Sequence, residues 1–210
     1  MFSPATRLLL DNERSKMNFQ ETVQRYAELL LGDGSWLTEE LAWTVLRPRV
    51  GPLTLSDVAQ RLAGNSHALI VERDFEEAYT DNAVVLDATD EAVMIVDLHR
   101  TSNTPDPDFI AQLSRNVDVW HVSWHTALSR RMIHALDGRI IAAVPHLDPA
   151  DAVGEDLHSV QAELAALSAA QHDPWPAVEA TALAIVEKRT GARLRLDWFD
   201  HAHPSIAIDQ

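Results

Sequence analysis

The sequence predicts an α+β fold: an antiparallel sheet of about five to six strands with helices packed on one face. Three observations lead to this prediction. Segments rich in β-forming residues follow one another through the middle of the chain, helical patterns come before and after them, and strand segments alternate apolar with polar residues. Such alternation is typical of a sheet with one buried face. We expect a single domain over residues 18–200, between a loose N-terminal arm (1–17) and a C-terminal tail (201–210).

The first predicted elements are a helix, a strand and a second, short helix. Apolar residues recur with helical spacing after Asn18, a potential N-cap, and this pattern stops at Gly32. β-forming residues then predict a strand over 41–46. Thr54 can cap a short amphipathic helix that ends at Gly64.

Strand candidates dominate the next part of the chain. Residues 67–71 and 83–86 are expected to pair with one another, with the acidic stretch 73–81 as a solvated loop or edge between them. A third strand is predicted over 92–98. The segment 102–108, which contains two prolines, is the strongest loop signal and the best candidate for an internal boundary.

A strand over 117–124 alternates cleanly, so that its tryptophans share a buried face while His121, Ser123 and His125 share the other. The remaining predicted elements are strands over 130–136 and 139–144 joined by a type I′ turn at Asp137–Gly138, a long helix over 153–167, a helix capped by Asp173 and stopped by Gly191, and a short element over 194–199.

Charge and composition exclude several functions. The chain has 17 Lys and Arg against 32 Asp and Glu, a formal charge of −15. Nucleic acids and anionic membranes are bound through clustered basic residues, so we expect neither as a partner. The chain has no cysteine, which removes disulfides, thiolate nucleophiles and cysteine-bearing metal sites.

Motifs that would define an enzyme are absent from the sequence. It contains no GxGxxG or GxxxxGK loop, no HExxH and no GxSxG, so we expect no cofactor. Apolar runs such as 92–96 and 140–144 have five residues, too short to cross a bilayer, and Asp11 interrupts the only apolar run near the N-terminus. A cytoplasmic protein is therefore expected.

Three segments resemble an uncharacterised, mainly actinobacterial family of small acidic proteins. They are Trp43 to Arg47 with Leu53 to Gly64, Ala127 to Arg130 with Asp137–Gly138 and Leu147 to Pro149, and Ala182 to Gly191. The resemblance covers roughly residues 36–200. Because no activity is known for the family, it supports the fold and implies no site residue.

Residues 53–66 also resemble the first helix and turn of a lac-repressor-type helix-turn-helix. That motif needs a recognition helix next, to enter the major groove of DNA. The residues that follow, 67–77, are instead rich in β-formers and acidic side chains, which DNA would repel. We therefore do not favour DNA binding.

Histidines provide the candidate metal ligands. His121 and His125 lie about 13 Å apart along a strand, too far to share one metal directly. Only together with His134 of the neighbouring strand could one of them join a set of metal ligands. The alternative is that they are polar residues on the less buried face. A second cluster of His and Asp at 197–203 is interpreted as part of the tail rather than as a metal site.

Six tryptophans are a high share of the aromatic residues. Those at strand positions are expected in the core. Trp36, Trp175 and Trp198 flank loops or helix ends, where exposure would let one of them anchor a partner.

Two functional hypotheses follow. The first is a non-enzymatic, acidic protein-binding domain that recognises a basic protein, for example by neutralising a basic toxin as immunity proteins do. The second is a small-molecule or metal-dependent enzyme that uses His121, His125 and His134 on an open sheet face. In the second hypothesis Arg130 or Arg131 would hold an anion.

Overall fold

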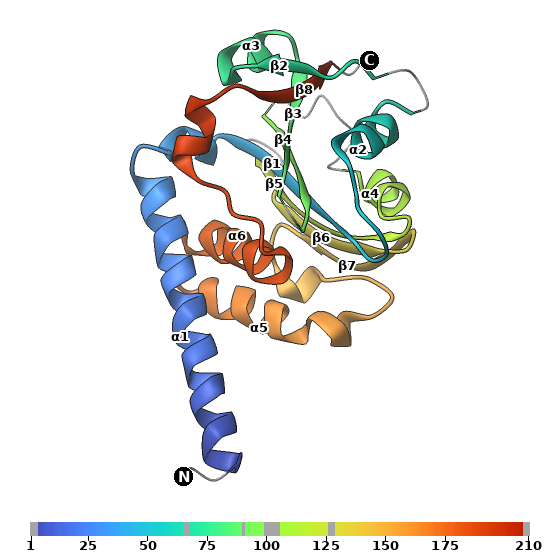
Figure 1. The fold of residues 1–210 in the computed structure, drawn as a ribbon. Helices are drawn as coiled ribbons and strands as arrows, with labels where there is room; N and C mark the ends of the chain where they lie inside the picture. The colour runs from blue at the N-terminus through green and yellow to red at the C-terminus, as the bar shows by residue number, and fades with distance from the viewer. Residues whose placement is uncertain (1–3, 65–67, 90, 99–105, 126–128, 208–210) are drawn as a thin grey trace.

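The protein is built on one sheet of eight strands, all of whose pairs are antiparallel (Figure 1). The computed structural model describes residues 4–64, 68–89, 91–98, 106–125 and 129–207, and of residues 4–17 the backbone only. The strand order is β2-β8-β3-β4-β1-β5-β6-β7. The strands are β1 (Glu40–Pro48), β2 (Val71–Arg73), β3 (Ala83–Ala88), β4 (Val93–Asp97), β5 (Val117–His125), β6 (Arg131–Leu136), β7 (Arg139–Pro145) and β8 (His203–Ala207). The α+β class is confirmed, but the expected strand count of five to six is wrong.

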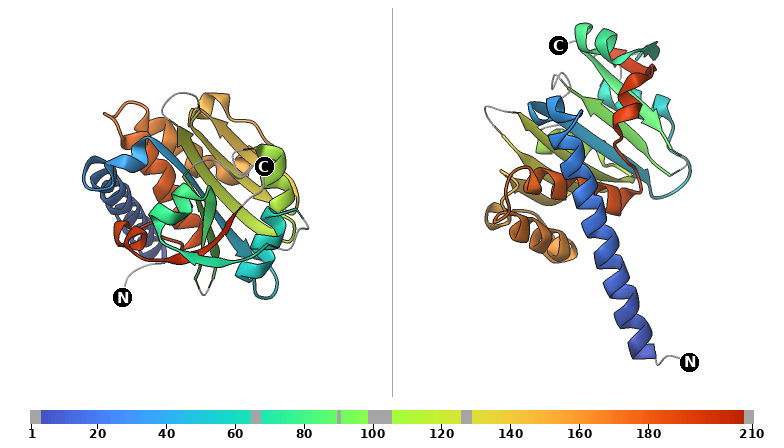
Figure 2. Two further views of the ribbon diagram at one scale, coloured as in Figure 1. Left: turned by 90° about the horizontal axis from the view of Figure 1, so that it is seen from above. Right: turned by 90° about the vertical axis from the view of Figure 1, so that its left-hand side faces the viewer.

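Helices cover both faces of the sheet, not one as expected. On one face α1, α5 and α6 pack against the sheet, and on the other α2 and α4 do so (Figures 1 and 2). The helices are α1 (Pro4–Leu31), α2 (Leu55–Leu62), α3 (Phe75–Thr80), α4 (Pro107–Leu113), α5 (Gln161–Ala170) and α6 (Ala177–Thr190), with short 3₁₀ turns η1 (Ser35–Thr38), η2 (Pro149–Asp151), η3 (Leu157–Val160) and η4 (Leu196–Asp200).

The alternation along β1 shows how the two cores are separated. Trp43 and Val45 belong to the cluster beneath α1 and α6, whereas Leu46 belongs to the cluster beneath α2 and α4. Thr44, which shares a face with Leu46, is fully buried as well. Central strands that are buried on both sides therefore carry a few polar residues inside the second core.

Two local predictions are confirmed. Thr54 caps α2 through a reciprocal capping box, in which its hydroxyl accepts from the Asp57 N–H and the Asp57 carboxylate accepts from the Thr54 N–H. Asp137 and Gly138 form the tight turn between β6 and β7, with φ of 51° and 82°. Both residues take the positive φ that a type I′ turn requires.

Three predictions around the sheet edge are wrong. Within the described residues, the strand predicted over 67–71 is replaced by β2, which begins only at Val71. β2 pairs with β8 rather than with β3. The stretch 73–81 holds helix α3, capped by Asp74, in place of a loop. The predicted tail over 201–210 contains β8, which lies between β2 and β3. Pairing over such sequence distances leaves no local signal.

The helices near the C-terminus start later than predicted. Asp156 caps η3, and α5 begins only at Gln161, so the apolar stripe from residue 153 spans a turn-rich segment before the helix. α6 begins at Ala177 rather than at Asp173, and it ends as expected at Gly191, which has a φ of 76°.

The first helix is longer than predicted. α1 begins at Pro4 rather than at Asn18, and its first turns project away from the body (Figures 1 and 2). Most of the loop predicted over 102–108 lies outside the described residues. In the described part of the chain, no helix combines the length and the apolar character needed to span a bilayer.

Candidate partner-binding groove

Three short elements that lie far apart in sequence meet beside the part of the sheet that contains β3 and β8. They are η1 before β1, α3 between β2 and β3, and η4 before β8 (Figure 1). Between them lies an open hollow with a volume of about 560 Å³. We term it the aromatic groove. Its lining residues are Asp33, Trp36, Phe75, Glu76, Tyr79, Leu98, Leu196, Phe199 and Asp200.

Two of the three elements, η1 and α3, are fixed to the body by the following contacts. η1 is held by Leu37, which is fully buried and whose carbonyl accepts a 2.7 Å hydrogen bond from the Trp124 indole. α3 starts at a capping box between Asp74 and Glu77 and buries Ala78 against the sheet. These contacts hold two walls of the groove against the body of the protein.

An edge-to-face aromatic cluster forms the floor. The Phe199 ring lies 4.9 Å from the Trp36 ring and 4.5 Å from the Phe75 ring, at angles of 84° and 70°. Trp198 supports this cluster from beneath, 5.5 Å from Phe75 and 5.0 Å from Phe199. Such arrangements place the positive edge of one ring against the negative face of the next.

Trp36 and Tyr79 leave much of the aromatic surface open to solvent. Trp36 is 40% exposed and Tyr79 is 54% exposed, while Phe75 and Phe199 are half-buried. Exposed aromatic rings that share one concave surface are typical of a site that binds a ligand or another protein.

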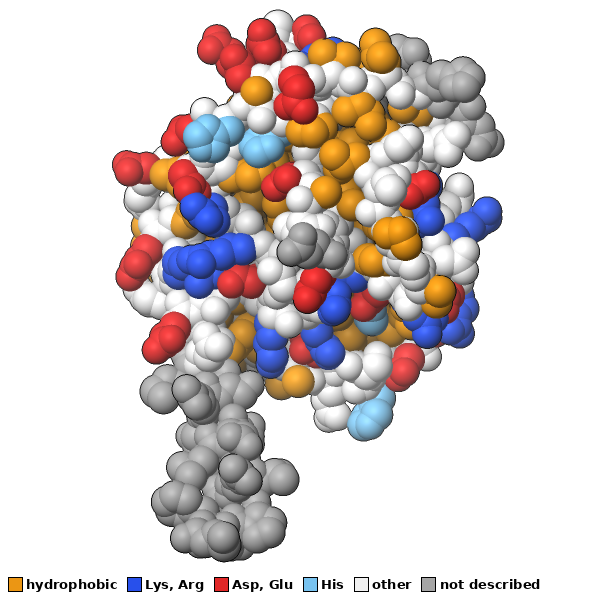
Figure 3. All heavy atoms as spheres, in the orientation of Figure 1, with side chains coloured by type: hydrophobic (Ala, Val, Ile, Leu, Met, Phe, Trp, Pro, Cys, Tyr) orange, Lys and Arg blue, Asp and Glu red, His pale blue; other side chains and the backbone are white. Residues whose placement is uncertain are grey.

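The charged residues that line the groove are all acidic. The carboxylates of Asp33, Glu76 and Asp200 stand on its rim, and none of the described residues that line it is basic. Acidic side chains also gather over neighbouring α3 (Figure 3). The groove therefore combines an apolar floor with a negative rim.

The three tryptophan candidates have different positions. Trp36 lines the groove. Trp198 lies behind it, where its indole N–H donates to Asp87 at 2.9 Å and its ring stacks 4.1 Å from that of His203. Trp175 is 56% exposed but does not line the groove.

The histidine candidates do not converge. His121 faces the core beneath α2 and α4 and is fully buried, so the open sheet face expected for it is closed. Its ring nitrogens lie 2.8 Å from the Thr44 hydroxyl and 2.9 Å from the Ser123 hydroxyl. These hydrogen bonds let three polar side chains sit in an apolar layer.

His134 lies on the opposite face of the sheet. It pairs in register with Trp120, its ring stacks 4.2 Å from the Trp120 ring, and its Nε2 lies 2.9 Å from Asp118. His125 ends β5, with Nε2 3.9 Å from Glu40. Arg130 contacts Glu179 at 2.9 Å, on α6. No group of three or more potential metal ligands occurs among the described residues.

The His and Asp cluster at 197–203 is divided between surface and sheet. Asp197 is exposed and pairs with Arg195, whose hydrogen bond lowers the pKa of that carboxyl. His203 belongs to β8, and its Nε2 lies 2.7 Å from the Trp198 carbonyl. His203 therefore helps to hold η4, one of the elements that line the groove.

Few of the residues that line the groove could be recognised from the sequence. Phe75 and Tyr79 lie in a stretch predicted to be a loop, although Asp74 and Glu77 at capping-box spacing could have identified α3. Phe199 meets Trp36 only through tertiary structure.

Comparison with known proteins finds no family model, no curated protein and no solved structure that matches the chain. The resemblance to an actinobacterial family therefore stays a prediction.

Proposed function

We propose that this protein is a non-enzymatic binding domain that recognises a cationic segment of a partner protein through the aromatic groove. The observation that carries the proposal is the combination, in one groove, of exposed aromatic rings with a rim of carboxylates. The formal charge of −15 adds a field that steers basic partners toward the molecule.

The chemistry of the groove suits arginine and lysine side chains. A guanidinium or ammonium group gains from contact with an aromatic face, and Trp36 offers the most favourable ring type. The aliphatic stem of the same side chain covers apolar surface, while Glu76 and Asp200 can pair with its charge. Exposed aromatic side chains are also frequent anchors of protein interfaces.

The test uses short, labelled peptides of equal length whose binding is followed by fluorescence anisotropy. One peptide alternates Arg with Leu, a second alternates Glu with Leu, and a third alternates Arg with Ser. We expect the Arg-Leu peptide to bind most tightly, with an affinity that falls as salt is added. Trp36→Ala should weaken its binding about tenfold or more, as loss of an aromatic anchor does.

Trp175→Ala is the matched control, since this tryptophan is exposed but lies outside the groove. It should leave binding unchanged, and circular dichroism should show that both variants are folded. Absence of binding by the Arg-Leu peptide, or an equal loss in both variants, would show that the groove is not the docking site.

A further inference from the structure

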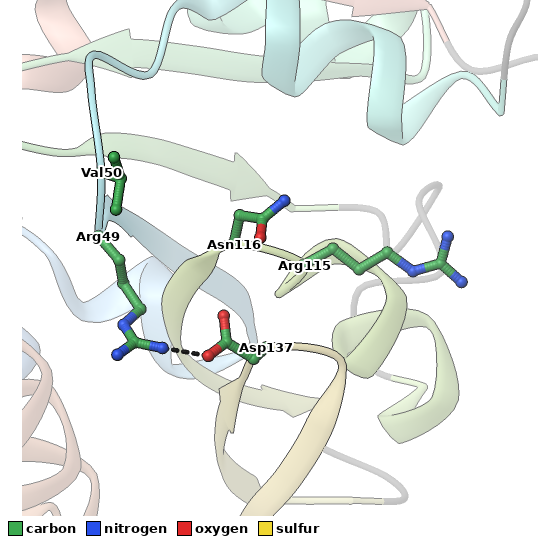
Figure 4. Close-up of a pocket in the computed structure, with 5 residues that line it drawn as sticks. All are labelled: Arg49, Val50, Arg115, Asn116 and Asp137. Carbon is green, nitrogen blue, oxygen red and sulfur yellow. Dashed lines mark hydrogen bonds and ion pairs between the residues drawn. The ribbon is translucent and has the colours of Figure 1, made fainter.

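A hollow of about 850 Å³ lies at the end of β1, and the charges that face it are already paired. Arg49, after β1, forms an ion pair there with Asp137 of the β6–β7 turn (Figure 4). The guanidinium group of Arg115 points away from this pair. Of these two arginines, the one that faces the hollow is therefore neutralised by the chain itself. A surface with a clearer need for a partner is the outward side of α1.

The two halves of α1 differ in how they are supported. In the second half, Phe19, Val23, Tyr26 and Leu30 pack into the core that α1 shares with α6. The first half projects away from the body (Figures 1 and 2). A helical segment of this length is only marginally stable in water by itself, because ordering the first turn costs much entropy. A second surface that packs along the first half would therefore stabilise it.

The side of α1 that is turned away from the core carries a regular stripe of residues. Counted in steps of three and four along the helix, its members are Arg7, Leu10, Arg14, Met17, Glu21, Gln24, Glu28 and Leu31. Such steps keep to one face of a helix. The four members in the second half are all exposed, and Leu31 is 60% exposed. We term this set the α1 stripe.

Charge is divided along the α1 stripe. Its first half contains Arg7 and Arg14, seven residues apart, and its second half contains Glu21 and Glu28 at the same spacing. One half of the stripe is therefore basic and the other half is acidic. A stripe with this order of charges repels a parallel copy of itself and attracts an antiparallel copy.

We infer that two copies of this protein pair through the α1 stripe, with their α1 helices antiparallel. When the helices overlap along their whole length, Arg7 of one copy comes level with Glu28 of the other, and Arg14 comes level with Glu21. A two-fold axis repeats both pairs, so that the contact closes on itself. The apolar positions of the stripe, Leu31 among them, are covered in the same contact. The inference goes beyond the aromatic groove and does not rest on it.

Sedimentation velocity of the full chain over a range of protein concentrations measures this pairing. We expect a reversible dimer with a micromolar dissociation constant that rises as salt is added, because salt screens the ion pairs. The double variant Glu21→Arg, Glu28→Arg makes the stripe basic throughout and should raise the dissociation constant about tenfold or more. Adding Arg7→Glu and Arg14→Glu to this variant inverts the order of charges and should restore pairing.

The double variant Glu72→Arg, Asp173→Arg is the control, because it changes the net charge equally at exposed positions outside α1. It should pair as the unchanged protein does, and circular dichroism should show that every variant is folded. A monomer at all concentrations, an equal loss in the control, or no recovery in the fourfold variant would each overturn the inference.

Single cysteines test the orientation of the two helices, since the chain has none of its own. Met17 is close to the two-fold axis of the antiparallel pair, so two copies of Met17→Cys should form a disulfide under mild oxidation. Leu31 of one copy is about 40 Å from Leu31 of the other in this arrangement, beyond the reach of a disulfide. If Leu31→Cys cross-links as fast as Met17→Cys, the helices are parallel and the inference is wrong.

Discussion

Replacement of Tyr26 by phenylalanine tests the contact that joins α1 to α6. The Tyr26 side chain is fully buried, and its hydroxyl donates to the Glu187 carboxylate at 2.7 Å and accepts from the Leu194 N–H at 3.2 Å. Tyr26→Phe removes both hydrogen bonds and leaves the Leu194 N–H buried without this partner. We expect a loss of about 1–3 kcal/mol of unfolding free energy at pH 7.

The same contact predicts how this loss changes with pH. Burial raises the pKa of Tyr26, and the adjacent carboxylate of Glu187 raises it further. In the unfolded chain the phenol titrates near its ordinary pKa of about 10. Above that pH the phenol of the unfolded chain loses its proton, whereas the phenol of the folded protein keeps it. Ionisation therefore stabilises the unfolded state and lowers the stability of the unchanged protein. Tyr26→Phe has no phenol to ionise at this position, so it escapes this loss. The gap between the two proteins should shrink by about 1.4 kcal/mol by pH 11.

Urea unfolding followed by circular dichroism at pH 7, 9, 10 and 11 measures this gap. Tyr79→Phe is the control, because Tyr79 is exposed and its change should cost no more than about 0.5 kcal/mol at pH 7. A gap that stays constant from pH 9 to 11 would refute the reasoning. It would mean that the buried phenol ionises equally easily in the folded and unfolded states.

Two further substitutions, each with its own control, test the Trp124 hydrogen bond and the Thr54 cap. Trp124→Phe should lower the unfolding free energy, measured in urea, by about 1–2 kcal/mol more than Trp43→Phe does. The reason is that the Trp124 indole N–H donates to the Leu37 carbonyl, whereas the buried Trp43 indole N–H has no hydrogen-bond partner in the described structure. Equal losses in the two variants would contradict this reasoning. Thr54→Ala should lower the unfolding free energy by about 1 kcal/mol through loss of the α2 cap, while Ser56→Ala, exposed in the same helix, should change it little. The effect of Thr54→Ala should diminish in acid, because the hydrogen bond from Thr54 lowers the pKa of Asp57 in the folded protein. The stability from this hydrogen bond is present above the pKa of Asp57 in the unfolded chain. It is lost as the pH falls through the pKa of Asp57 in the folded protein.

Signals that depend on a few neighbouring residues predicted the structure well. The Thr54 cap and the Asp137–Gly138 turn need only local chemistry, and both are where the sequence placed them. The exposure of the second sheet face was predicted wrongly for a physical reason. His121 and Ser123 are polar, but hydrogen bonds within the layer satisfy them, so alternation of polarity did not mean exposure to water.

The candidate groove could be predicted only in part. Trp36 was expected to be exposed because it flanks a loop or helix end, and its side chain is 40% exposed. Its neighbours Phe75 and Phe199 come from segments far away in the sequence, and no single window of sequence connects them. What brings them together is the pairing of β8 with both β2 and β3, which depends on the whole sheet.

The position of β8 also constrains when the groove can form. β2 has β8 as its only described strand partner, and β8 follows every other described strand in the chain. During synthesis, β2 and α3 therefore emerge long before the strand that fixes them to the sheet, and contacts over such separations form slowly. Until then, the aromatic rings of α3 lack their partners in η4. The ability to dock a partner should accordingly be among the last properties that a newly made chain acquires.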